Sequence, residues 1–176
     1  TPEEERMPLP DDELVPKPVL EAHRAITIKA SAAAIWPWLV QLGQGRGGFY
    51  SYQRLENLAG CGIQNADKII PDFQKIKIGD LVRLGPEGYP AFDVAGIEPK
   101  TALILRGDLP NPNGQPTTWI WIFYLHPQED GTTRLLLRTR LEFGGAFPVT
   151  PGQSDPPPDP AWAFGTDVED APVGVI

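Results

Sequence analysis

Cysteine and histidine are scarce in this chain of 176 residues, which contains only Cys61, His23 and His126. A single cysteine excludes an internal disulfide framework, and the wide separation of these three residues does not match the ligand spacing of a zinc site. Both histidines lie near the ends of predicted strands at outward-facing positions, so neither is placed to activate the thiol. We therefore expect no metal, no cofactor and a buried, inert Cys61.

Long apolar runs are also absent. No stretch approaches the ~20 apolar residues that span a bilayer, and no signal-peptide pattern opens the sequence. Together with the single cysteine, these absences favour a cytoplasmic location. The first residue, Thr1, is not methionine, so an upstream segment is compatible with the sequence, and membrane association stays open.

Positive charge is in the minority. The net charge is −8 at neutral pH, of which residues 1–22 carry −5, residues 141–176 carry −6 and the middle of the chain carries +3. An acidic chain is a poor match for nucleic acid, because phosphate binding requires clustered lysine and arginine. The acidic ends either fold back over the mildly basic centre or remain as solvated tails.

Proline divides the chain into three parts. Five prolines in the first eighteen residues predict an extended, Pro-rich acidic arm over residues 1–20, whose apolar side chains can attach it to the surface: Met7, Leu9, Leu14 and Val15. Residues 21–143 are predicted to form one ligand-binding domain. Residues 144–176 contain seven prolines and no amphipathic repeat, which predicts a second Pro-rich acidic segment rather than a helix.

Two short helices are predicted on either side of a glycine-rich loop. The first follows Ser31, a good N-cap residue, and has apolar residues at i, i+3, i+4 and i+7 spacing: Ile35, Trp38, Leu39 and Leu42. Pro37 should bend this helix between two tryptophans, because its ring collides with the carbonyl group one turn earlier. The second helix ends near Gly60 and has the same spacing at Tyr52, Leu55 and Ala59.

Six segments are predicted to be strands. Residues 22–30 alternate, with Ile26 and Ile28 facing inward. Short, turn-rich links separate five further strands: residues 80–84, 91–98, 101–106, 117–126 and 132–143. Short links require antiparallel pairing, because a parallel neighbour needs a long crossover connection. Trp119–Leu125 is apolar at every position, which predicts a central strand covered on both faces.

The order of one strand, two short helices and an antiparallel meander resembles the helix-grip fold of the START-like superfamily, also called the SRPBCC or polyketide cyclase/dehydrase and lipid-transport group. The chain is similar to a bacterial branch of it with a WPWLVQ-G-RGGFYSY signature, present here in residues 36–52. The resemblance implies an α+β fold in which a curved antiparallel sheet encloses a cavity for a hydrophobic, lipid-like or polycyclic ligand. It implies no catalytic set shared by all members.

The sequence departs from that fold at its C-terminal end. Members of the superfamily close the fold with a long C-terminal helix that packs against the sheet. No such helix is predicted in residues 144–176, so it is either truncated or replaced by the Pro-rich segment or another chain. An uncovered sheet face would expose a large apolar patch, which predicts a protein partner or a homo-oligomer.

The glycine-rich loop also matches a dinucleotide-binding pattern, G-x-G-x-x-G, over residues 43–48. The context argues against this function, because a helix rather than a strand precedes the glycines and parallel βαβ units are missing. The favoured interpretation is a tight turn that uses positive φ angles, with Arg46 at its tip.

Aromatic and inward-facing positions supply the candidate ligand-binding residues: Trp36, Trp38, Phe49, Tyr50, Tyr52, Trp119, Trp121, Phe123, Leu137 and Thr139. Tyr124 and Arg138 are further polar groups of the sheet that could enter the cavity, although Arg138 also suits a solvated face. No catalytic residue is assigned. Tyr50, Tyr52 and Glu56 are the only candidates, because a tyrosine and a carboxylate can exchange protons in a cyclisation or dehydration.

Three functions are compatible with this sequence. The first is binding of a hydrophobic small molecule or lipid in an internal cavity, without covalent chemistry. The second is an enzyme of the cyclase/dehydratase type. The third is a structural or interaction subunit whose apolar sheet face packs on another chain.

Overall fold

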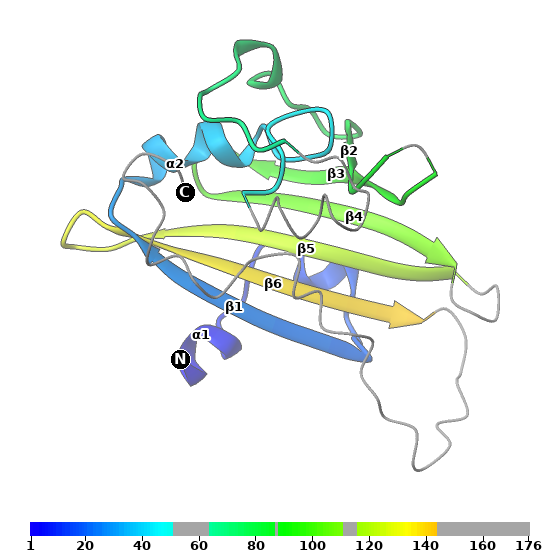
Figure 1. Ribbon diagram of the computed structural model, residues 1–176. Coiled ribbons are helices and arrows are strands. Elements are labelled where there is room, and N and C mark those ends of the chain that lie inside the picture. The colour runs from blue at the N-terminus through cyan, green and yellow to red at the C-terminus, as the bar shows by residue number, and fades with distance from the viewer. Residues whose placement is uncertain (51–63, 87, 111–115, 144–176) are drawn as a thin grey trace.

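The computed structural model describes residues 1–50, 64–86, 88–110 and 116–143. These residues form a six-stranded antiparallel sheet with the strand order β1-β6-β5-β4-β3-β2 (Figure 1). In chain order, the helices, 3₁₀ turns (η) and strands are α1 (Pro2–Arg6), η1 (Asp12–Leu14), β1 (Leu20–Ile28), α2 (Ala32–Leu39), η2 (Pro71–Phe73), β2 (Leu81–Arg83), β3 (Ala91–Glu98), β4 (Ala102–Pro110), β5 (Pro116–Pro127) and β6 (Thr133–Phe143).

The predicted strands and their antiparallel meander are confirmed. Every neighbouring pair in the sheet is antiparallel, and β1 completes the sheet by pairing with β6. The largest difference is in β4, which continues to Pro110 rather than ending at Arg106, because β5 pairs with it along its whole length. The apolar strand β5 lies inside the sheet, as its composition predicts.

The helix predicted after Ser31 is also confirmed as α2. The Ser31 hydroxyl accepts a hydrogen bond of 3.3 Å from the Ala34 amide, and the helix ends two residues after Pro37. The predicted α+β fold class, a curved antiparallel sheet with short helices, is therefore confirmed. The second predicted helix, Cys61 and the C-terminal Pro-rich segment lie outside the described residues.

The two faces of the sheet have different covers. The inner face, which we define as the face that packs against α2, carries the larger core. Side chains alternate along a strand, so Trp121, Phe123 and Leu125 of β5 lie together on this face. They pack against the helix residues Ile35 and Leu39. In Figure 1, α2 lies on one side of the sheet and α1 on the other.

The outer face is covered by the N-terminal arm of the chain itself. Leu9 and Val15 are buried, and Met7 packs beside them, on a second apolar cluster formed by the sheet: Ala102, Ile104, Ile120, Ile122 and Leu136. Leu14 remains exposed. The arm also contains α1, a helical turn that we did not predict, which begins with proline because the first helical amide needs no intrahelical partner.

Ion pairs tie this arm to β6. Arg138 is only 4% exposed and donates to the Asp12 carboxylate and to the backbone carbonyls of Glu4, Glu5 and Met7. Arg138 is therefore not on a solvated face, and it points away from the inner face. The acidic N-terminal end folds back onto basic strand residues rather than remaining solvated, because the charges are complementary.

None of the helices in the described residues combines the length and the apolar character needed to cross a bilayer.

Candidate functional site

The candidate site is the aromatic part of the inner face. Four rings from β3 and β5 lie in sequence there, and we call them the aromatic ladder: Phe92, Trp119, Trp121 and Phe123. Their neighbouring centroids are 4.9 to 6.3 Å apart, with interplanar angles of 56° to 87°. Edge-to-face packing of this kind holds each ring in a defined orientation.

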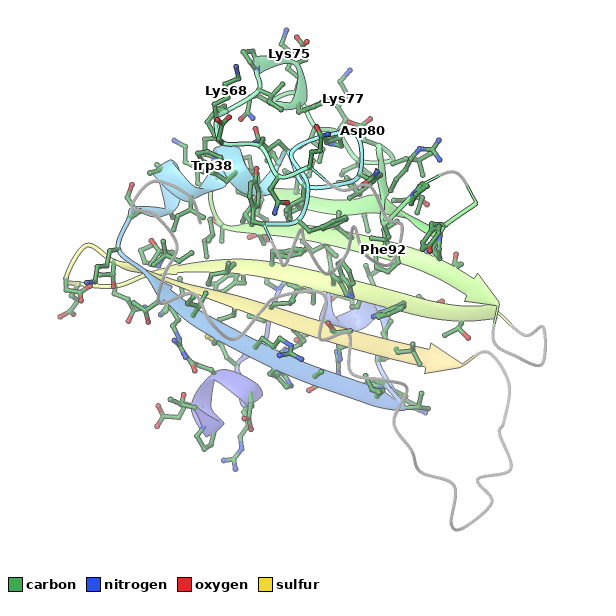
Figure 2. The ribbon with its side chains drawn as sticks, viewed as in Figure 1. Trp38, Lys68, Lys75, Lys77, Asp80 and Phe92 are labelled. Carbon is green, nitrogen blue, oxygen red and sulfur yellow. The ribbon has the colours of Figure 1, made fainter. Side chains whose placement is uncertain are left out.

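A glycine in β4 makes room for the first ring of the ladder. A Cβ atom on Gly107 would lie 2.4 Å from two ring carbons of Phe92, which is closer than packed carbon atoms approach. Phe92 is fully buried and lies on the same side of the sheet as α2 (Figure 2). Gly107 is paired with Trp119, so the missing side chain lets Phe92 sit directly beside the indole.

Side-chain size falls sharply beside the ladder. Trp121 pairs with Thr139 of β6, and Thr139 pairs with Ala22 of β1, so these three residues form one row across the inner face. An indole is followed by a threonine and then by a methyl group. The next row ends on Arg24, which pairs with Leu137 and therefore faces the same way. Along the row from Trp121 to Ala22, the inner face therefore changes from a large aromatic side chain to small side chains.

The glycine-rich loop after α2 closes one side of this core. Gly43 and Gly48 pair in an antiparallel bridge and have φ angles of 124° and 76°, a region that glycine tolerates. Arg46 donates to the Val40 carbonyl at 2.8 Å and lies over the Phe73 ring at 4.8 Å. The predicted tight turn is confirmed, and the loop follows a helix rather than the strand that a dinucleotide site requires.

A buried glutamine organises the same region. The Gln41 side chain donates to the Tyr50 hydroxyl at 2.5 Å and accepts from the Ile70 amide at 3.0 Å. Burial raises the pKa of Tyr50, against the smaller opposing effect of the Gln41 hydrogen bond. The Asn65 side chain accepts from the amides of Phe49 and Tyr50. Tyr50 is therefore held as a neutral, hydrogen-bonded structural group.

The structure brings most of the candidate ligand-binding residues to one core. The residues that pack in the inner cluster are Trp36, Phe49, Tyr50, Trp119, Trp121, Phe123 and Leu137. Thr139 shares this face by register, and Trp38 meets Tyr50 edge-on at 5.6 Å. Tyr52 and Glu56 lie outside the described residues. Tyr124 belongs to the outer cluster, so its expected place in the cavity is wrong.

The inner face also carries two buried polar groups, one on the candidate Trp119 and one on Thr117, which was not among our candidates. Thr117 is 3% exposed, and its hydroxyl has no hydrogen-bond partner. The indole nitrogen of Trp119 is also buried without a partner. Thr117 lies two residues before Trp119 on β5 and therefore faces the same way. The sequence marks Thr117 only as an inward position next to an aromatic run.

No arrangement for a metal is evident in the part of the chain that the structure describes. No group of three or more histidine, cysteine or acidic side chains comes together there. The histidine of β1, His23, instead contacts Glu21 at 2.8 Å and accepts from Arg138 on the outer face. What the inner face offers chemically is apolar aromatic surface with a few hydrogen-bonding groups.

Comparisons with known proteins give structural similarities only. No protein-family description and no curated protein matches the chain. It is similar to the crystal structure of protein MLL2253 from Mesorhizobium loti (18% identity, 73% of this chain, 79% of that chain, TM-score 0.42). It is also similar to the solution structure of the Aha1 dimer from Colwellia psychrerythraea (15% identity, 76% and 81%, TM-score 0.42). At this level of likeness, the fold assignment depends on the strand order and pairing of this chain itself.

Proposed function

We propose that the protein binds a hydrophobic small molecule or lipid-like ligand on the inner face of the sheet, without covalent chemistry. The observation that carries this proposal is the abrupt change from Trp121 to the small side chains of Thr139 and Ala22 in one row of the sheet. Aromatic surface next to small side chains on a mostly apolar face is typical of a site for an apolar molecule.

The described residues favour binding over acid–base catalysis. A general acid or base works best when its pKa lies near the operating pH. Tyr50 has a raised pKa and a hydroxyl already engaged by Gln41. A cyclase/dehydratase reaction would therefore need its proton-transfer groups elsewhere. The N-terminal arm already covers the apolar outer face, so an interaction subunit would have to use the inner face.

Equilibrium dialysis against the flat tricyclic probe fluorene tests the proposal. Ala22→Phe places a ring beside Thr139 in this row, and we expect it to weaken fluorene binding at least tenfold. Ala25→Phe is the matched control, because Ala25 lies on the same strand but on the opposite face. It should leave the affinity within about twofold of the native value.

The proposal is overturned if native protein does not bind fluorene, or if both variants bind it as the native protein does. Native mass spectrometry of the purified protein, followed by solvent extraction, provides an independent measurement. A co-purified apolar molecule that is lost in Ala22→Phe and retained in Ala25→Phe would support the same site.

A further inference from the structure

Two adjacent inward positions of β5 carry polar groups that the protein itself does not satisfy. The Thr117 hydroxyl and the Trp119 indole N–H are both buried, and neither has a hydrogen-bond partner. Buried polar groups are nearly always paired in proteins, because an unpaired group loses the hydrogen bond that it made to water. Two such groups at one end of a strand face are therefore unusual.

Two other buried polar side chains of the described chain are paired. Thr133 of β6 is also fully buried, and its hydroxyl donates to the Ala30 carbonyl at 2.8 Å. Buried Gln41 uses both ends of its amide, which meet the Tyr50 hydroxyl and the Ile70 amide. Single atoms of some charged groups, such as Asp12 Oδ1 and Arg46 Nε, also lack a hydrogen bond, but other atoms of the same groups are bonded. Thr117 and Trp119 differ from these groups, because the one polar atom of each side chain has no partner.

The neighbouring strands offer no side-chain acceptor at these positions. Trp119 pairs with Gly107 on one side and with Leu141 on the other. Thr117 pairs with Leu109 and Phe143. All four neighbours are glycine or hydrocarbon residues, which have no side-chain hydrogen-bonding atoms. The paired residues of β4 and β6 therefore supply no side-chain acceptor for the two donors.

We propose that Thr117 and Trp119 form a subsite for the carbonyl oxygen of a flat apolar ligand. A carbonyl oxygen has two lone pairs and can accept from both groups, and the indole N–H can act only as a donor. The two residues are two positions apart on one strand, so their side chains leave the same face of the sheet.

The aromatic ladder supplies the apolar part of this site. Phe92 and Trp121 flank Trp119, with ring centroids 5.7 and 5.9 Å from it. A flat ring system that contacts these rings brings its polar substituent to the Thr117 end of the face. The inference rests on the proposed function, and it specifies the ligand class as an aromatic or polycyclic ketone rather than a hydrocarbon or a fatty chain.

The test compares two probes that differ only in the carbonyl group, 9-fluorenone and fluorene. Equilibrium dialysis with the native protein, Thr117→Val and Trp119→Phe gives the affinity for each probe. We expect each substitution to weaken 9-fluorenone binding about threefold to tenfold relative to fluorene, because each removes one hydrogen bond to the oxygen. Normalising to fluorene corrects for any change in apolar contact.

Thr118→Val is the matched control, because Thr118 is the next residue of β5 and donates to Asp108, away from the inner face. It should leave the ratio of the two affinities unchanged. The inference is overturned if the ratio is the same in native protein, Thr117→Val and Trp119→Phe, which would mean that the carbonyl oxygen does not contact these groups. In that case, fluorene binding would leave the proposed function standing. If native protein binds neither probe, both proposals fail.

Discussion

The strongest prediction concerns the attachment of the N-terminal arm to β6. Arg138 is almost fully buried and donates to the Asp12 carboxylate, the Met7 carbonyl at 2.7 Å and the Glu5 carbonyl at 3.1 Å. Asp12→Ala removes the counterion and leaves a buried cation. Breaking a buried pair in this way typically costs about 3–5 kcal/mol. The Asp12 side chain is 21% exposed, and the backbone carbonyls still accept from Arg138 in the variant. We therefore expect Asp12→Ala to lower the free energy of unfolding by about 2–3 kcal/mol.

A double-mutant cycle separates this pair from the other contacts of Asp12, which also accepts from the Leu9 amide at 2.9 Å. The free energy of unfolding is measured in urea for Asp12→Ala, Arg138→Met and the double variant. We expect a coupling energy of about 2 kcal/mol, because the double variant no longer contains an unpaired buried charge.

An exposed pair on the same sheet provides the control. Arg106 and Asp108 lie 3.2 Å apart, and their side chains are 46% and 58% exposed. Solvent screening should limit their coupling energy to below about 0.5 kcal/mol. If the coupling of Asp12 with Arg138 is no larger than that of this exposed pair, the arm is not held by the buried ion pair and the reasoning is wrong.

Three further predictions concern the ladder, the arm and the subsite. Gly107→Ala should destabilise the protein by about 1–3 kcal/mol, because the added Cβ overlaps the buried Phe92 ring. Hydrogen bonds from Arg134 and, second, from the N-terminal ammonium group lower the pKa of Glu4 from 4.5 to about 2. The ionised Glu4 therefore stabilises the folded state above pH 4.5, and this stabilisation is lost as the pH falls towards 2. Glu4→Gln should cost about 1 kcal/mol at pH 6, and clearly less at pH 3. Thr117→Val should be neutral or stabilising by up to about 1 kcal/mol, because it replaces an unpaired buried hydroxyl with a methyl group. Urea unfolding measures all three.

Each of these has a control and an outcome that contradicts it. Phe92→Leu should partly restore the stability of Gly107→Ala, and an unchanged stability of Gly107→Ala alone would contradict the overlap. A cost of Glu4→Gln that is equal at both pH values would argue against the ion pair. Thr133→Val loses the hydrogen bond to Ala30 and should cost about 1–2 kcal/mol. A similar cost for Thr117→Val would indicate that its hydroxyl is paired after all.

The strands and their faces were predictable because alternation is a local property of the sequence. Ile26 and Ile28 face the inner core as expected, and the same reasoning placed Trp121 and Leu137 correctly. It could also have excluded Tyr124 from the cavity, because that residue is out of phase with the inward tryptophans of β5. Gly107, a lone glycine inside a strand, was an available sign of close packing that we did not use.

The environment of Arg138 was not predictable in the same way. Alternation placed it opposite Leu137, which is correct, but a charged face of a strand is normally solvated. Its burial depends on Asp12, which is 126 residues away in the sequence. A pattern within a few positions of the sequence cannot predict a contact between residues so far apart in the chain. The same holds for Thr117, whose lack of a partner is known only once both neighbouring strands are in place.

The sequence by itself determined the strands, the start of α2, the turn in the glycine-rich loop and the face on which most side chains lie. These features depend on backbone preferences and on the spacing of apolar residues within a few positions. Only the tertiary structure decided that the acidic arm covers the outer face and that Thr117 and Trp119 share an unsatisfied end of the inner face. Burial and hydrogen-bond pairing belong to groups of residues that are distant in the chain, so they exist only after the sheet has formed.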